Sequence, residues 1–436
     1  MTSNLTIAQK WIQEFGTNGY DSSNAVAVDS EGNVYVTGVT EGDLGGINNG
    51  KEDIWLSKYD SNGNQLWIEQ WGTTFADSVG DLAIDRNGNI SIAASTLALQ
   101  DEGFYVNEYA LIQYDTSGNL VSVDSQPKTN TIKEIEVDGA GNLYTLGLLE
   151  GKWFVSKSDS RGDRLWIEEF KSSVGATFGR LSDLTVNSQG DVYLGMEIKL
   201  DAIFTQTIHR VVKYSSAGKQ RWFKDFWDGF LPDINSDSRG NLYAFGNGEL
   251  IKYNSNGSEQ WQYQWEDKDG WLSSEEVGVD RDGNVYLLVN IGGAETEFIK
   301  LDITGKELWK QPLNLTKSID EIEVDGDGTV YLTGRSKGDF SDRDFNAWVG
   351  KFAEVAIAPV NEAPTDITLS ENSIVENSTT GTVIAQLTTT DSDSDIHTYS
   401  LIDDAEGRFA IEGNELKVAD GSKLDFEASS SHSIKV

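Results

Sequence analysis

The sequence predicts an all-β protein whose larger part is a seven-bladed β-propeller. Two interleaved repeats lead to this prediction. The first is Asp-x-x-Gly-Asn followed by an aliphatic residue and Tyr, and it recurs roughly every 50 residues, as propeller blades do. Its seven copies, some of them imperfect, are Asp29–Tyr35, Asp85–Ser91, Asp138–Tyr144, Asn187–Tyr193, Asp237–Tyr243, Asp280–Tyr286 and Asp325–Tyr331.

The second repeat reads Lys-Tyr-Asp-x-x-Gly-x-x-x-Trp and lies between copies of the first. Its copies end at Trp67, Trp166, Trp222, Trp261 and Trp309, a sixth ends at Ser122, and a seventh stops after Lys351 and Phe352. Because the second unit has Ser91 in place of Tyr and Ser122 in place of Trp, it lacks two large packing groups and is predicted to be the weakest blade. The recurring lysines are expected to cover apolar surface with their stems and to pair with nearby acids; they are Lys58, Lys157, Lys213, Lys252, Lys300 and Lys351.

Each repeat unit is predicted to hold four short strands. In the first unit they are Ala25–Val28, Asn33–Val39, Asp53–Tyr59 and Gln65–Trp71. Val, Ile, Leu, Tyr and Trp dominate these runs, as the pleated and packed surface of a sheet requires. Between them, Asp initiates a hairpin turn and Gly adopts positive φ.

The seventh unit is predicted to borrow its outer strand from the N-terminus. It provides only Ile319–Val324, Thr329–Gly334 and Asn346–Phe352, whereas the segment around Trp11 aligns with Gln65–Gly72. Such an exchange closes the ring and leaves no open face between the first and last blades. Residues 1–352 are therefore predicted to form a seven-bladed propeller closed by the N-terminal strand.

The segment Trp11–Gly38 resembles the bacterial seven-bladed β-propeller repeat, SBBP. The segments that end in Trp also resemble the tryptophan-docking repeats of quinoprotein propellers. The resemblance covers about the first four-fifths of the chain and implies the fold. It does not imply one function, because propellers carry many unrelated activities.

The remainder of the chain is predicted to be a linker over residues 353–364 and a β-sandwich over residues 365–436. The sandwich strands are expected at Ile367–Leu369, Thr382–Thr388, Tyr399–Ile402, Phe409–Ile411 and Glu415–Val418. The segments Asn361–Pro364, Ile374–Asn377, Thr390–Asp393, Gly407–Ile411 and Leu424–Glu427 resemble a bacterial cadherin-like domain. Since such a domain has one further strand, this one is expected to be incomplete at its C-terminal end.

The cadherin-like resemblance implies calcium as a ligand. In that family, the residues matching Glu376, Asp425 and Glu427 bind calcium toward the following domain, and those matching Asp391 and Asp393 bind it toward the preceding one. Here Ala358, Val360 and Asn361 stand where the family mostly has Asp and Asn. Both sites are therefore expected to be weak or incomplete, although Asp391 and Asp393 could also form only a solvated turn.

The composition restricts the classes of partner. The chain has 436 residues, with 34 Lys and Arg, 71 Asp and Glu, and a formal net charge of −37. This charge argues against nucleic acid and against anionic membrane surfaces. There is no Cys and there are only three His. Neither an apolar run long enough to insert into a membrane nor a Sec signal peptide is recognisable, so the export route stays open.

A ring of acidic residues is predicted at one mouth of the propeller channel. Six of the seven units carry Asp or Glu four residues before the first repeat, at the start of the innermost strand; these are Asp81, Glu134, Asp183, Asp233, Glu276 and Glu321. Carboxylates that face one axis could bind a metal ion or a cationic ligand. Alternatively, each could bond backbone N–H groups of the neighbouring blade, as repeated residues commonly do.

No catalytic constellation is recognisable in the sequence. The leading hypothesis is a non-catalytic bacterial protein, extracellular or at the cell surface, that binds a protein or carbohydrate and mediates adhesion. In it the propeller is a recognition disc and the cadherin-like module binds calcium. The alternative is a propeller enzyme, namely a quinoprotein-like dehydrogenase, a lyase or a glycosidase.

Overall fold

The computed structural model describes residues 5–99, 105–126, 131–149, 152–170, 177–199, 207–226, 233–246, 248–265, 272–291, 295–313, 315, 317–337, 345–356, 364–391 and 396–436. The chain divides into two compact units, Met1–Val355 and Ala356–Val436. This division falls within the predicted linker. Among the described residues, none forms a helix that is long and apolar enough to cross a membrane.

The described residues of the first unit form seven four-stranded sheets, and six of these sheets follow the chain order without interruption. The first sheet holds β2 (Asp21–Val28), β3 (Val34–Thr40), β4 (Asp53–Tyr59) and β5 (Gln65–Trp71), and the second holds β6 (Asp77–Ile84), β7 (Ile90–Leu99), β8 (Tyr105–Tyr114) and β9 (Leu120–Gln126). The third holds β10 (Thr131–Val137), β11 (Leu143–Leu149), β12 (Lys152–Ser158) and β13 (Arg164–Glu169).

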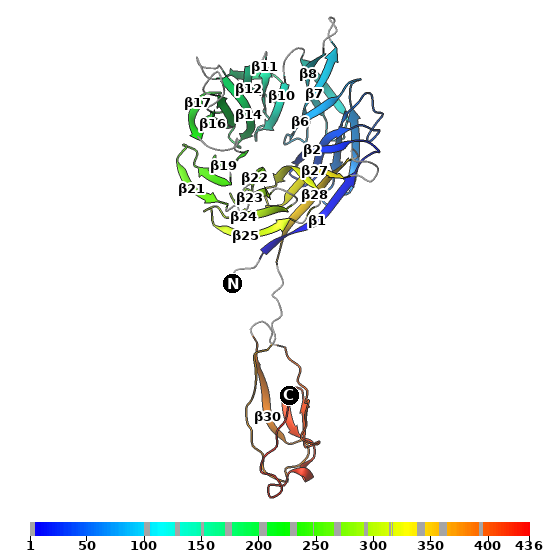
Figure 1. Cartoon of the computed structure of the whole chain (residues 1–436), viewed down its shortest axis with the longest axis vertical. Coiled ribbons are helices and arrows are strands. Elements are labelled where there is room, and N and C mark those ends of the chain that lie inside the picture. The colour runs from blue at the N-terminus through cyan, green and yellow to red at the C-terminus, as the bar shows by residue number, and fades with distance from the viewer. Residues whose placement is uncertain are drawn as a thin grey trace. The chain divides into compact units, whose positions relative to one another are not determined.

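The fourth sheet holds β14 (Thr177–Val186), β15 (Val192–Lys199), β16 (Thr207–Tyr214) and β17 (Gln220–Phe226), and the fifth holds β18 (Asp233–Ser236), β19 (Leu242–Gly246), β20 (Glu249–Tyr253) and β21 (Glu259–Gln264). The sixth holds β22 (Leu272–Val279), β23 (Val285–Ile291), β24 (Glu295–Leu301) and β25 (Glu307–Leu313). Figure 1 shows the sheets around a common centre, with first strands such as β6, β10 and β22 near it and β17, β21, β25 and β1 at the rim.

The seventh sheet joins the two ends of the first unit. Its strand order is β1 (Leu5–Phe15), β28 (Phe345–Ala356), β27 (Val330–Lys337) and β26 (Ser318–Val324). The prediction that the N-terminal strand supplies the outer strand of this sheet is confirmed. β28 continues four residues beyond the strand predicted at Asn346–Phe352, because the segment 353–356 contains no Pro or Gly that would interrupt it.

The first strand of the first sheet also starts earlier than predicted, at Asp21 instead of Ala25. The four residues from Asp21 to Asn24 are polar, so the sequence favours a loop there. In the structure, however, Ser22 and Ser23 are almost fully buried. The Ser23 hydroxyl lies 2.7 Å from the carbonyl oxygen of Gly334 and 2.8 Å from that of Trp348. These hydrogen bonds connect the first sheet to the seventh.

The predicted turns are present in every sheet of the first unit, with Asn187 in place of Asp in the fourth. In the first of them, Asp29 Oδ1 accepts hydrogen bonds from the backbone N–H groups of Glu31 and Asn33, at 2.9 and 3.0 Å. Gly32 has a φ of 78°, a conformation that favours glycine. The core lies between neighbouring sheets; Tyr35 and Leu56 of the first sheet, for example, belong to one buried cluster with Ile92 and Ile112 of the second.

The second unit contains one four-stranded sheet with the order β29 (Asp366–Leu369), β30 (Val383–Thr390), β32 (Glu415–Val418) and β31 (Phe409–Glu412), and a short 3-10 helix, η1 (Gly421–Lys423). The strand predicted at Tyr399–Ile402 is wrong, because only an isolated bridge between Asp403 and Lys435 lies nearby. Asp403 and Asp404 accept hydrogen bonds from the N–H groups of Ala405 and Gly407, which curls this segment into a turn. Among the described residues a single sheet stands where a two-sheet sandwich was expected.

Candidate functional site

The six predicted channel carboxylates meet in one cavity of about 410 Å³ in the first unit. Residues from the first strand of all seven sheets line this cavity, which we call the central cavity. Its lining includes Asp81, Glu134, Asp183, Asp233, Glu276 and Glu321. The sequence reasoning missed Glu136 and Glu323, which also line it. The period of two in a strand could have found them, because each lies two residues beyond a predicted carboxylate and so points to the same side.

Four of the six carboxylates bond the backbone of the next sheet. Asp81 accepts a hydrogen bond from the N–H of Ile135 at 2.8 Å, and Asp183 accepts one from Ile234 at 2.7 Å. Asp233 accepts from the N–H of Val277 at 2.6 Å, and Glu321 from that of Val26 at 2.9 Å. For these four residues, the interpretation that they connect neighbouring sheets is confirmed. The last of these bonds again joins the seventh sheet to the first.

Glu134 and Glu276 differ from the other four. Within the described part of the chain, neither accepts a hydrogen bond from the next sheet. The Lys133 ammonium lies 2.7 Å from Glu134 Oε1. Burial and neighbouring carboxylates raise the pKa of Glu134 and of Glu276 to about 8. These two groups could therefore exchange protons near neutral pH.

The other channel carboxyls are also hard to ionise. Burial, opposed by hydrogen bonds from Ile135 and Leu82, raises the pKa of Asp81 to about 7. Burial and the charge of Asp325 raise the pKa of Glu323 to about 8. Burial and the charge of Asp81 raise the pKa of Glu136 well above its usual range. Several carboxyl groups in one narrow cavity thus share protons instead of all being charged.

Among the described residues that line the central cavity, no three carboxylates lie close enough together to chelate one ion. Among the described residues, the one group of three whose oxygens lie within 4.8 Å of one another is Glu376, Asp425 and Glu427, all exposed, in the second unit. The structure thus brings together the three residues that the cadherin-like resemblance placed at one calcium site. Glu376 Oε2 accepts a hydrogen bond from the N–H of Phe426 at 3.1 Å, and Asp425 Oδ1 accepts from Glu427 and Ala428 at 3.0 and 3.1 Å.

The second predicted calcium pair is described only in part. Asp391 Oδ2 lies 3.8 Å from His397 Nδ1, and the Asp391 side chain is 3% exposed. Asp393 lies outside the described residues. Asp391 is not a member of the carboxylate group formed by Glu376, Asp425 and Glu427.

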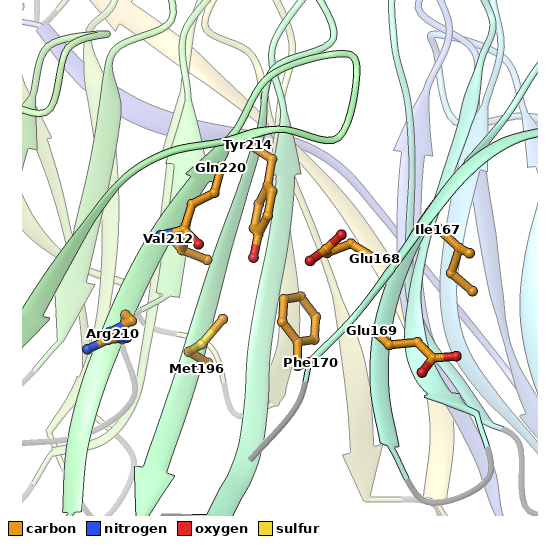
Figure 2. Close-up of a pocket in the computed structure, with 9 residues that line it drawn as sticks. All are labelled: Ile167, Glu168, Glu169, Phe170, Met196, Arg210, Val212, Tyr214 and Gln220. Atoms are coloured by element: carbon orange, nitrogen blue, oxygen red, sulfur yellow. The ribbon is translucent and has the colours of Figure 1, made fainter. Parts of the chain in front are cut away.

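A further cavity of about 580 Å³ lies between the third and fourth sheets. Figure 2 shows the Glu168 carboxylate and the Tyr214 hydroxyl pointing toward each other above Phe170. The rings of Phe170 and Tyr214 pack edge to face, with centroids 6.2 Å apart. Arg210 is already paired with Asp225, at 2.6 Å, and its guanidinium lies 4.0 Å from the centre of the Phe223 ring. This cavity therefore offers an aromatic wall and a carboxylate, with its one guanidinium already neutralised.

Comparisons with known proteins concern the fold. The family model of the SBBP β-propeller repeat matches residues 10–45. No curated protein matches the chain. A solved structure of the mitotic checkpoint complex aligns with a TM-score of 0.52 and 9% identity, over 78% of this chain and 93% of that one. Virginiamycin B lyase from Staphylococcus aureus aligns at a TM-score of 0.47 and 11% identity, over 80% and 99%. The chain thus contains an SBBP β-propeller repeat within an all-β fold of four-stranded sheets.

Proposed function

We propose that the first unit is a seven-bladed propeller closed by β1. Three features support this proposal. The unit has seven four-stranded sheets, and the seventh contains both ends of the unit. The first and seventh sheets are joined by the bonds of Ser23 and Glu321 described above. The first strands of all seven sheets line one cavity.

We further propose that the protein is a non-catalytic binding and adhesion protein of the bacterial cell surface or exterior. Its partner is a protein or a carbohydrate, and its second unit is a cadherin-like module that binds calcium. The observation that carries this proposal is the cluster of Glu376, Asp425 and Glu427. Glu376 is 49 positions before Asp425 and 51 before Glu427 in the chain, yet the oxygens of all three approach within 4.8 Å.

The chemistry of the cluster favours weak calcium binding. Calcium takes six to eight oxygen ligands, and clustered carboxylates provide them while the ion neutralises their repulsion. Since Asp425 Oδ1 already accepts two backbone hydrogen bonds, three side chains cannot complete the coordination alone. We expect a dissociation constant of about 10⁻⁴–10⁻³ M, as in extracellular calcium modules.

Calorimetric titration of the full chain with Ca²⁺ tests this proposal. Binding in that range should disappear in D425N and in E376Q, but remain in E412Q, which changes an exposed carboxylate of the same unit. Absence of heat together with an unchanged melting temperature in excess Ca²⁺ would refute a calcium-binding module in this chain.

The alternative proposal is a propeller enzyme, such as a lyase, a glycosidase or a quinoprotein-like dehydrogenase. It is supported by Glu134 and Glu276, whose pKa of about 8 suits proton transfer near neutral pH. An activity screen against glycosides and lyase substrates, with E134Q and E276Q as controls, tests the first two. An absorbance scan for a bound chromophore tests the third.

A further inference from the structure

One interface between sheets differs from the others in three side chains at once. Six sheets contain a Tyr on the second strand, a Lys on the third and a Trp on the outer strand, which in the seventh sheet is Trp11 of β1. In the second sheet these positions hold Ser91, Gln113 and Ser122. The Ser122 hydroxyl donates a hydrogen bond to Gln113 Oε1 at 2.9 Å, so the replacements contact one another.

In the first, third, fourth, fifth and sixth sheets these three side chains form a compact stack. The Tyr and Trp rings have centroids 5.9–6.4 Å apart, as for Tyr35 and Trp67 or Tyr193 and Trp222. The Lys ammonium lies 4.7–4.9 Å from the centre of the Tyr ring. Aromatic pairs and cation–π contacts of this kind add to the stability that burial provides.

Except for Trp309, which donates to Glu354 Oε1 at 2.7 Å, the Trp of each stack also contacts the turn of the next sheet. The indole N–H of Trp166 donates to the carbonyl of Ser216 at 3.0 Å, that of Trp222 to Ser255 at 3.1 Å, and that of Trp261 to Ile303 at 3.0 Å. The ring covers the glycine two residues later. A Cβ placed on that glycine would lie 2.7–3.1 Å from the ring at Gly63, Gly118, Gly218, Gly257 and Gly305.

At the interface between the second and third sheets this position holds no ring. A Cβ placed on the corresponding Gly162 would meet nothing within 4 Å. Among the described residues, no donor bonds the carbonyl of Ser160, the counterpart of Ser216 and Ser255. A cavity of about 650 Å³ lies there, which we call the rim slot; its lining includes Ser91, Gln113, Tyr109, Phe154, Ser160 and Gly162.

We propose that the rim slot binds the indole side chain of a tryptophan from a partner polypeptide. At four other interfaces the equivalent position is filled by an indole that lies on a glycine and donates its N–H to a carbonyl; these are Trp11, Trp166, Trp222 and Trp261. Tyr109 and Phe154 provide aromatic surface, and Ser160 provides the acceptor. This proposal rests on the proposed binding function and names the chemistry of its partner.

The surroundings of the slot favour a polypeptide over a small aromatic molecule. β9 is the outermost strand of its sheet, so its free edge can pair with an added strand. Leu120, Val121 and Val123 on β9 are 48%, 64% and 37% exposed. Other outer strands, among the described residues, expose at most one large apolar side chain each, such as Leu66 or Leu165. A peptide along β9 would cover this surface, which a free indole would leave in water.

The test uses the full chain and a peptide of about ten residues with one Trp, together with the same peptide carrying Ala and with indole alone. Calorimetry is preferred over fluorescence, because the chain itself has 13 Trp. The Trp peptide should bind saturably, and the Ala peptide at least about 10-fold more weakly. S122W, and S91Y/Q113K/S122W as the variant that rebuilds the whole stack, should abolish binding and raise the melting temperature.

R221W is the matched control, because it adds an exposed tryptophan to an outer strand whose neighbouring position is already filled by Trp222; it should bind like the parent. W222S should create a second slot and raise the stoichiometry from one to two. Equal affinity of the parent and the rebuilt variant, or no binding of the Trp peptide, would overturn the proposal. Binding of indole without the peptide would assign the slot to a small aromatic ligand instead. None of these outcomes depends on calcium, so they are distinguishable from a failure of the calcium module.

Discussion

The interface between the fourth and fifth sheets and the one between the second and third sheets arise from the same repeat but are packed differently. In the former, Tyr193, Lys213 and Trp222 stack and reach the turn of the fifth sheet. In the latter, Ser91, Gln113 and Ser122 leave a cavity of about 650 Å³. The strand order is nevertheless the same, since the sheets at both interfaces keep four strands in chain order. Strand order therefore depends on the repeat as a whole, whereas the stack determines how tightly neighbouring sheets pack.

The largest expected effect comes from removing a whole side of one interface. Deletion of residues 1–16 removes Ile7, Trp11 and Phe15, of which Phe15 packs edge to face on Trp55 with centroids 5.0 Å apart. Each buried side chain contributes roughly 1.5–3 kcal/mol, so the first unit should lose about 5 kcal/mol or more. Thermal and denaturant unfolding measure this loss.

The control for this deletion is K10A, which changes an exposed side chain of the same strand. It should unfold like the parent. If the deletion variant also melts at the parent temperature, β1 does not hold the seventh sheet against the first.

The second prediction converts the tight interface into the loose one. W222S removes the indole that covers Gly257 and bonds Ser255. Replacement of a buried Trp by a small residue costs about 3–5 kcal/mol, and the value should lie at the lower end because the Trp222 side chain is partly exposed. Urea unfolding measures the change, with R221A on the adjacent exposed position as the control. A loss below about 0.5 kcal/mol would mean that the stack contributes little to packing.

Much of the difference between these two interfaces could be predicted from the sequence, because the strands and turns of each sheet depend mainly on residues within one repeat. The borrowed strand followed from Trp11, and the absence of a Tyr and a Trp from the second sheet was visible as Ser91 and Ser122. The residues of the central cavity were predicted only in part. Glu136 and Glu323 were not predicted, because the repeats were compared at a single position. Residues two apart in a strand point to the same side, so each of these residues faces the cavity together with the predicted carboxylate two positions before it. Which carboxylates bond the next sheet depends on distances across the interface, which no single repeat contains.

The second unit was harder to predict. The resemblance to a cadherin-like domain grouped Glu376 with Asp425 and Glu427, and the structure does bring these residues together. The strand expected at Tyr399–Ile402 is absent, because a strand needs a hydrogen-bonded partner along its length. Asp403 and Asp404 instead bond nearby N–H groups, and such local competition is weakly visible in an alternating pattern.

The third prediction separates the centre of the unit from its rim. Burial raises the pKa of Glu323 to about 8, above the value of about 4.3 expected in the unfolded chain. Between these values the folded state keeps a proton that the unfolded state loses, so stability falls as the pH rises from about 5 to about 8. E323Q should remove part of this slope, by roughly 1–2 kcal/mol between those limits, in unfolding measured at several pH values.

E69Q changes an exposed carboxylate at the rim and should leave the slope as in the parent. The central cavity is lined by a strand from every sheet and not by the rim alone. E323Q should therefore change the pH dependence of stability by the same amount in the parent and in W222S. Unequal slopes in these two backgrounds would show that the packing at the rim and the charges at the centre are coupled.

The smallest expected effect concerns local opening of β9. A strand without an indole above it has fewer buried contacts, so it should open at a lower free energy than its counterparts. Hydrogen exchange should therefore be about 10-fold faster, or more, for amides that pair β9 with β8 than for those that pair β5 with β4 or β13 with β12. In S91Y/Q113K/S122W the exchange of β9 should slow to the rate of β5 and β13. Equal protection of the three outer strands in the parent would contradict the comparison, because the missing stack would then have no effect on the strand that carries it.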